Sequence, residues 1–297
     1  MRWWNDRQMV RYVSRELDLR FNSNRKRMEL AKNNRSKTII DLALDNYLAQ
    51  QTHNGSSDAM DATFRDFATS QLRTFVFAGH DSTGSTICYA FHLLSTHSSV
   101  RHSLIAEHNR VLGPDIDQAA SRLSQNPHIL GQLRYTLAVV KETLRMYPPA
   151  SSTRSGEPGH SIQGLDGRQL PTDGFLVWSN SYAIHHAHQY WPEPNKFIPE
   201  RWLVEEGDDL YPPKGAYRPF EFGPRNCIGQ ELAMLEIRLV LTMTAREFEI
   251  KSVYNEWDSL HPTNGPKMVN GDRAYQILSG AAHPSDGLPC RISLAVD

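Results

Sequence analysis

The sequence has few cysteines, no excess of charge of either sign and no long apolar run. Its 297 residues include three cysteines, Cys88, Cys227 and Cys290, which lie far apart and form no CxxC pair. This pattern excludes a disulfide framework and a cysteine-rich zinc site, and it is typical of a reducing compartment. The 32 Lys and Arg residues nearly balance the 33 Asp and Glu residues. No charge pattern therefore marks a nucleic-acid partner or a polybasic membrane address.

The sequence also lacks an apolar segment long enough to span a bilayer, and its first stretch, MRWWNDRQMVRYV, is polar and rich in arginine. These features predict a soluble, cytoplasmic chain. A length of 297 residues with 39% hydrophobic content is sufficient for one large or two ordinary domains. Because no Gly/Ser linker separates the segments of the chain, we expect a single mixed domain over residues 1–297.

The residue pattern changes along the chain. Residues 1–150 are predicted to be helical, because apolar residues recur at spacings of three and four. Residues 151–200 form short β-prone pieces divided by Gly, Pro and Asp, which predict a small sheet of hairpins. Residues 218–248 contain a loop and the last long helix, and residues 249–297 are again strand-like. The apolar stripe of that helix consists of Ile228, Leu232, Leu235 and Leu239.

The helix that contains Glu142 and Arg145 has two interpretations. At about 100° per residue, apolar side chains cover most of its circumference, and Glu142 lies at the edge of a narrow polar arc. A desolvated carboxylate at this position needs a charged partner. A solvated ion pair between residues three apart is equally compatible with the pattern. The sequence alone leaves both interpretations open.

The stretch FVFAGHDSTGST, residues 75–86, interrupts a long helical pattern. Gly79 costs about 1 kcal/mol relative to Ala inside a helix, and the Asp, Ser and Thr that follow compete for backbone hydrogen bonds. Taken alone, the stretch favours a helix end, with Asp81 or Ser82 as the N-cap of a second helix. The alternative is a groove for a bound ligand, lined by an acid and a hydroxyl that can pass protons.

Cys227 lies in a glycine-bounded turn at the start of the last helix. Gly223 and Gly229 allow a tight turn or a close approach of the backbone, and Arg225 can bind a carboxylate through two N–H groups. The start of a helix favours the thiolate over the thiol. An isolated cysteine is usually a small buried hydrophobe, but this setting favours a metal-bound thiolate. The histidines within residues 185–188 lack metal-ligand spacing and are interpreted as polar loop residues.

Taken together, these motifs resemble the signature of the cytochrome P450 family. The pattern F-x-x-G-x-R-x-C-x-G is matched in full from Phe220 to Gly229, and Glu142 with Arg145 matches E-x-x-R. The stretch PERW is similar to the P-E-R-F element and contributes Arg201. The stretch AGHDST is similar to the oxygen-binding groove A-G-x-D/E-T, with serine where threonine is usual.

The resemblance extends from about residue 36 to the end. Family members carry upstream a membrane anchor, a first β-sheet and further helices that find no counterpart here. The chain therefore resembles the C-terminal part of a microsomal-type, fungal member. The implied fold is the mainly helical P450 fold with a small β-hairpin sheet, truncated at its N-terminus. Full-length relatives are anchored in the membrane of the endoplasmic reticulum.

The resemblance also implies a cofactor, haem b, and a role for each matching residue. Cys227 is the expected axial ligand of the haem iron, and Arg225 and Arg154 are the expected partners of the haem propionates. The remaining implied cofactor-binding residues are Phe220, Gly229, Ala78 and Gly79. The implied catalytic residues, which pass protons during oxygen activation, are Asp81 and Ser82 or Thr83. The implied structural cluster is Glu142, Arg145 and Arg201, where Arg201 is the second cation that a desolvated Glu142 requires.

The activity implied by the resemblance is that of a haem-thiolate monooxygenase. It would use O2 and electrons from NADPH, delivered by NADPH–cytochrome P450 reductase, to hydroxylate or epoxidise an apolar small molecule in fungal secondary metabolism. One alternative is a non-catalytic remnant that keeps the motifs but does not hold haem. Another is an isomerase or dehydratase of the same fold that needs no oxygen, against which the pair Asp81 and Ser82 counts. The sequence leaves the identity of the substrate open.

Overall fold

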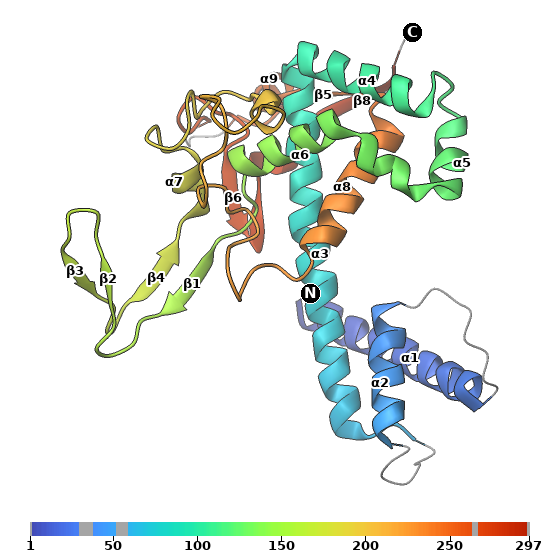
Figure 1. Cartoon of the computed structure of the whole chain (residues 1–297). Helices are drawn as coiled ribbons and strands as arrows, with labels where there is room; N and C mark the ends of the chain where they lie inside the picture. The colour runs from blue at the N-terminus through green and yellow to red at the C-terminus, as the bar shows by residue number, and fades with distance from the viewer. Residues whose placement is uncertain (1, 30–37, 52–58, 263–266, 296–297) are drawn as a thin grey trace. The chain divides into compact units, whose positions relative to one another are not determined.

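The computed structural model describes residues 2–29, 38–51, 59–262 and 267–295 (Figure 1). Within these residues helices dominate, and the named strands form small two-stranded antiparallel sheets. None of the helices found there combines the length and the apolarity that a membrane crossing requires. The chain divides into two compact units, residues 1–80 and 81–297.

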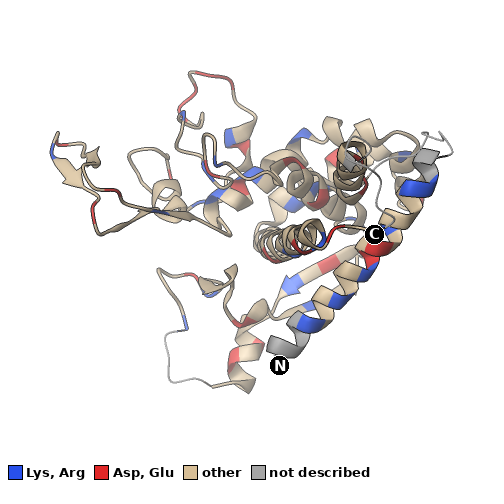
Figure 2. Cartoon of the chain, turned by 90° about the horizontal axis from the view of Figure 1, so that it is seen from below, with Lys and Arg blue, Asp and Glu red and all other residues tan. Residues whose placement is uncertain are grey.

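The described residues of the first unit form α1 (Arg2–Glu29), α2 (Ile39–Gln51) and the beginning of α3 (Ala62–Thr96). These helices share one small apolar core, whose fully packed members are Leu17, Phe21, Leu44, Leu48 and Ala68. Outside that core α1 is strongly charged. Figure 2 shows blue Lys and Arg bands along the helix that begins at the N label. The apolar face of α1 therefore lies towards α2 and α3, and its charged face remains solvated.

The second unit contains the remainder of α3 and the other helices. These are α4 (Ser98–Leu112), α5 (Gln118–Gln125), α6 (Arg134–Met146), α7 (Ser181–His185), α8 (Gln230–Thr244) and α9 (Tyr254–Leu260). Three 3₁₀ turns are interspersed, at Pro127–Gln132, Pro199–Trp202 and Ser285–Gly287. The main core joins α3, α6 and α8 through Tyr89, Leu93, Val139, Val140, Leu144, Ile237 and Leu241. The centre of α6 is thus enclosed, which places its polar residues in a desolvated environment.

The last long helix, α8, faces the core differently from the sequence prediction. The predicted apolar stripe is exposed, to 86% at Ile228 and 60% at Leu232, whereas Met234, Ile237 and Leu241 are buried. Both sets repeat at spacings of three and four, so the helix has two apolar stripes. Periodicity alone cannot determine which of them packs inward.

The named strands pair in twos, as shown in Figure 1. In the predicted β-rich segment, β1 (Ser152–Ser155) pairs with β4 (Leu176–Ser179) and encloses the smaller hairpin of β2 (Ser161–Gln163) and β3 (Gln169–Pro171). In the tail, β5 (Phe248–Ser252) pairs with β8 (Cys290–Leu294), and β6 (Gln276–Ser279) with β7 (Ala281–Pro284). The hairpin prediction is confirmed. The strand prediction for the tail was wrong at α9, because residues 254–260 pack as a short helix beside these strands.

Helix α3 does not end at Gly79. It is continuous from Ala62 to Thr96, so the predicted helix end with a new N-cap was wrong. Contrary to the prediction from the sequence, the polar side chains after Gly79 do not interrupt the backbone hydrogen bonds of the helix. The Asp81 carboxylate binds β7 instead of capping a helix, and the Thr86 hydroxyl donates to the Ser82 carbonyl at 2.9 Å without breaking the helix.

Candidate functional site

The carboxylate of Glu142 is fully buried and accepts five hydrogen bonds. Oε1 accepts from Arg145 Nη2 at 2.8 Å, from the N–H of Ile198 at 3.1 Å and from Arg201 Nε at 3.2 Å. Oε2 accepts from Arg145 Nε and from Trp202 Nε1, both at 3.0 Å. All three charged side chains have no exposed surface. The structure therefore brings Glu142, Arg145 and Arg201 together as a desolvated cluster, in which two cations share one acid.

The remaining N–H groups of Arg145 extend this cluster. They donate to the carbonyl oxygens of His185, Pro194 and Lys196 at 2.7–3.0 Å. The buried ring of His185 is bonded at both nitrogens, since Nδ1–H donates to the Arg145 carbonyl at 3.0 Å and Nε2 accepts from the N–H of Arg218 at 2.9 Å. Burial lowers the pKa of His185 to about 3, so the ring stays neutral and keeps this pattern.

His185 thus corrects one interpretation from the sequence. It is a buried link between α6 and the segment before Cys227, and not a polar loop residue. Its neighbours give no support to a metal site either. In the part of the chain that the structure describes, no group of three or more His, Cys, Asp or Glu side chains could hold a metal ion.

The loop before α8 closes on itself and presents Cys227 at its end. The N–H of Cys227 donates to the Phe220 carbonyl at 2.9 Å, and the N–H of Asn226 donates to the Gly223 carbonyl at 3.0 Å. Gly223 has a φ of 82°, a conformation that strongly favours glycine. Phe220 is half-buried against the core, whereas Arg225 and Cys227 are exposed. The thiol is free.

Glu221 joins this loop to the first hairpin. Its Oε1 accepts from the N–H of Ser152 at 3.1 Å and from the Ser152 hydroxyl at 2.8 Å. Its Oε2 lies 3.5 Å from the hydroxyl of Ser179 on β4. Arg154, two residues after Ser152, is exposed on β1, and its Nη1 donates to the carbonyl of Thr153. The hairpin that carries Arg154 is therefore bonded directly to the cysteine loop.

The donor set around Cys227 fits haem. The loop offers one exposed thiol and no further clustered ligand, which suits a metal that brings its other ligands with it and takes one axial bond from the protein. Gly229 keeps one side of the sulfur uncovered, because a Cβ at that position would touch Cys227 Sγ in ordinary van der Waals contact at 3.8 Å. Arg225 and Arg154 have the charge that propionates require. The residues present are thus the ones that haem ligation by a thiolate needs.

On α3 the predicted groove residues have different environments. Asp81 and Ser82 are half-buried, while Thr83 is 4% exposed and its hydroxyl has no hydrogen-bond partner within the described residues. Ala78 and Gly79 are exposed and belong to the first unit. A Cβ at Gly79 would meet no atom within 4 Å, so the structure shows no crowding there that would require glycine.

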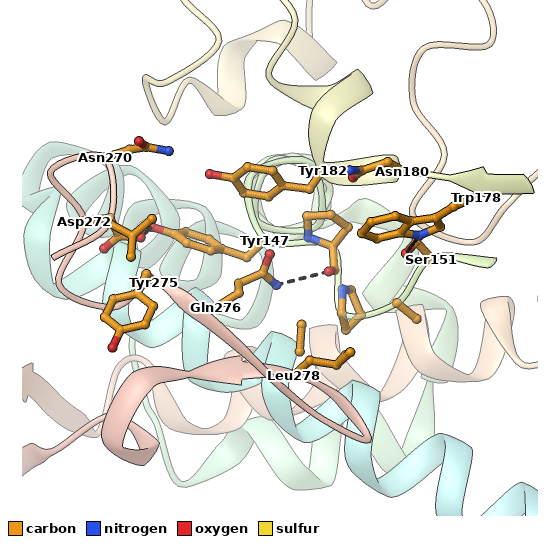
Figure 3. Close-up of a pocket in the computed structure, with 15 residues that line it drawn as sticks. Tyr147, Ser151, Trp178, Asn180, Tyr182, Asn270, Asp272, Tyr275, Gln276 and Leu278 are labelled. Atoms are coloured by element: carbon orange, nitrogen blue, oxygen red, sulfur yellow. Dashed lines mark hydrogen bonds between the residues drawn. The ribbon is translucent and has the colours of Figure 1, made fainter. Parts of the chain in front are cut away.

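The second unit also contains a pocket of about 360 Å³ (Figure 3). One wall is the segment from Tyr147 to Ser151, and the facing wall includes Gln276 and Leu278 of β6. Gln276 Nε2 donates to the Pro148 carbonyl at 3.1 Å across this gap. Aromatic rings line much of the rest, namely those of Tyr147, Trp178, Tyr182 and Tyr275. The pocket is mainly apolar, with a few polar groups, as ligand pockets are.

Several of these functional contacts had no signal in the sequence. Glu221 lies at an unspecified position of the cysteine motif, and its partners are 69 and 42 residues away. His185 was noted only as one of a group of histidines. The contact between Asp81 and His283 also had no signal in the sequence, because the two residues are 202 positions apart.

Comparisons with known proteins agree with these motifs. The family described as Cytochrome P450 matches residues 4–278. Cytochrome P450 monooxygenase polC of Polytolypa hystricis is 41% identical over 99% of this chain and 52% of its own length. Cytochrome P450 monooxygenase acrF of Aspergillus aculeatus is 39% identical over 86% of this chain and 56% of its own length. The chain thus spans about half the length of the curated relatives it matches.

A cytochrome P450 crystal structure at 23% sequence identity has a TM-score of 0.68 over 96% of this chain and 56% of that chain. This likeness shows the mainly helical P450 fold with its small sheets. The family match covers nearly the whole chain, and it includes the segments that carry the buried Glu142 cluster and the cysteine loop. The resemblance predicted from the motifs is therefore confirmed, and this chain belongs to the cytochrome P450 family.

Proposed function

We propose that this chain carries the haem-thiolate part of a monooxygenase that hydroxylates or epoxidises an apolar small molecule in fungal secondary metabolism. The observation that carries the proposal is the exposed thiol of Cys227, presented at the end of a loop that closes on itself by backbone hydrogen bonds. When bound through this thiolate, haem supplies the activation of O2 for insertion of one oxygen atom into the substrate. NADPH, through NADPH–cytochrome P450 reductase, is the proposed electron source.

The chain's own residues hold the cofactor and supply protons. Cys227 would ligate the iron, Phe220 and Gly229 would lie beside its sulfur, and Arg225 and Arg154 would bind the propionates. The carboxylate of Asp81 would take up protons from solvent, and the hydroxyl of Ser82 would pass them on towards the cofactor site. Thr83 is the second candidate for that hydroxyl. Serine lacks the β-branch that stiffens threonine, so we expect looser coupling of reductant use to product than a threonine would give.

The aromatic pocket in Figure 3 is the proposed place for part of the substrate. Its walls are the segment that leads into β1, which carries Arg154, and the hairpin β6–β7, which binds α3 at Asp81. A molecule in this pocket would therefore lie beside the segment that leads to Arg154 and beside the hairpin that binds Asp81. The preference for apolar substrates follows from the aromatic lining.

The test is haem loading of the purified chain, followed by the difference spectrum with carbon monoxide. A thiolate-ligated haem gives a red-shifted Soret band that Cys227→Ser should abolish. Cys290→Ser is the matched control, because Cys290 is also an exposed free cysteine. If the chain takes up no haem, or if both variants behave alike, the proposal fails. The chain is then the alternative, a protein that keeps the motifs without holding the cofactor.

The proton relay has a separate test. Ser82→Ala should lower the amount of product formed per NADPH consumed, whereas Thr83→Ala should leave this ratio unchanged. A ratio that stays constant in Ser82→Ala and falls in Thr83→Ala assigns the relay to Thr83.

A further inference from the structure

The hairpin β6–β7 binds both oxygens of the Asp81 carboxylate. Oδ2 accepts the N–H of Ala281 at 2.6 Å, and Oδ1 lies 3.0 Å from Nε2 of His283. An ionised carboxylate only accepts hydrogen bonds, so Nε2 of His283 carries the hydrogen in this contact. The side chains of Asp81 and His283 are 22% and 28% exposed. The two side chains are therefore shielded from much of the solvent, which strengthens the hydrogen bond between them, and both still have some solvent-exposed surface.

The hairpin contacts α3 at more than one point. One turn after Asp81, the hydroxyl of Ser85 donates to the Ala282 carbonyl at 2.5 Å. The N–H of Ala282 donates to the Pro149 carbonyl at 2.8 Å on the opposite side. The contacts of Ala281 and Ala282 use backbone atoms and would form with almost any residue there. The contact of His283 is made by its side chain. Among these hairpin residues, His283 is therefore the one whose identity matters for the contact with α3.

We propose that His283 is a positioning residue for Asp81. Its Nε2–H holds the carboxylate against the hairpin and thereby fixes the proton-carrying group next to Ser82 in the helix. This inference rests on the proposed function, in which Asp81 and Ser82 supply protons. Without His283, Oδ1 loses its only hydrogen-bond donor among the described residues, and the carboxylate turns about its side-chain torsions towards water. Proton delivery to Ser82 then becomes less frequent.

The competing explanation is that His283 only pins the hairpin. The structure offers a control for it, because Ser85→Ala removes a hairpin contact on α3 without changing the carboxylate of Asp81. His283→Gln is the conservative variant, since the amide nitrogen of glutamine reaches about as far as Nε2 and can donate to Oδ1. His283→Leu removes the donor and keeps an apolar side chain of similar size.

The first measurement is amide hydrogen exchange at Ala281 in the full chain, which needs no haem. His283→Leu should speed this exchange about ten- to a hundredfold, the effect of losing one hydrogen bond to a charged group. His283→Gln should restore the wild-type rate. In Asp81→Asn, the substitution of His283 should add little, because the two side chains act as a pair. Unchanged exchange in His283→Leu, or equal rates in the Leu and Gln variants, overturns the proposal.

The second measurement is product formed per NADPH consumed in the haem-loaded chain. This ratio should fall in His283→Leu, recover in His283→Gln and stay unchanged in Ser85→Ala, even though the latter also opens the hairpin. An equal fall in His283→Leu and Ser85→Ala refutes positioning and leaves a purely structural role. A chain that binds no haem refutes the proposed function, and the exchange rates still test the contact between His283 and Asp81.

Discussion

Replacing Glu142 by glutamine should destabilise the protein more than its small change in shape suggests. Two of the three donors at Oε1 and both donors at Oε2 belong to side chains, and all five donors are N–H groups. An amide can place its oxygen at one of these positions only. With the oxygen at Oε1, the NH₂ group faces the N–H groups of Arg145 and Trp202. Two buried donors are then unpaired, and two buried cations have lost their anion.

The magnitude follows from these contacts. Each unpaired buried donor costs about 1–3 kcal/mol, and breaking a buried ion pair by removing one partner costs about 3–5 kcal/mol. We expect the free energy of unfolding to fall by about 3–5 kcal/mol, against a total of about 5–15 kcal/mol for a typical domain. Urea unfolding followed by circular dichroism measures this change.

Two further variants keep this prediction open to refutation if Glu142→Gln does not fold. Trp202→Phe removes one of the five donors and should cost about 1.5–3 kcal/mol, the range for a hydrogen bond to a charged group. Glu256→Gln makes the same chemical change in an exposed ion pair with Arg291 and should leave the unfolding midpoint unchanged. A loss below about 1 kcal/mol in Glu142→Gln would show that water, and not the two arginines, compensates the charge.

Three shorter predictions concern other sites. Burial lowers the pKa of His108 to about 4, so the histidine of the unfolded chain binds a proton at higher pH than that of the folded chain. The free energy of unfolding should therefore drop as pH falls from about 6.5 to about 4. In urea unfolding at several pH values, His108→Gln should flatten this part of the pH dependence. Thr83→Val should leave the free energy of unfolding unchanged or slightly higher, because the buried hydroxyl of Thr83 has no partner in the described residues. Thr86→Val should lower the free energy of unfolding, because the Thr86 hydroxyl donates to the Ser82 carbonyl. Glu221→Ala should speed the loss of haem, measured by transfer to apomyoglobin, because Ser152 no longer holds the cysteine loop.

The sequence was sufficient for the motifs and insufficient for the contacts between them. The apolar residues around most of α6 made burial of Glu142 one of two open interpretations, and the structure shows that it is the correct one. The inward face of α8 could not be predicted, because two stripes of the same period compete and only packing against α3 and α6 selects one. The continuity of α3 through Gly79 was missed for a related reason. The carboxylate of Asp81 is occupied by β7, about two hundred residues later, and is therefore not available as a cap.

A path of hydrogen bonds and short chain segments joins the cysteine loop to α6 on one side and to α3 on the other. From the buried cluster, Arg145 bonds to His185, and His185 bonds to Arg218 ahead of the cysteine loop.

On the other side, Glu221 in the loop bonds to Ser152. Three residues earlier in the chain, Pro149 accepts from Ala282, whose carbonyl accepts from Ser85 on α3. Every contact in this path includes a hydrogen bond that involves a backbone atom, and the side chains of His185 and Glu221 are each held at two points. A displacement of the cysteine loop is therefore resisted from α6 and from α3 at once. On the proposed function, these links tie the loop that carries Cys227 to the helix that carries Asp81 and Ser82, and the Glu142 cluster anchors one end of this path.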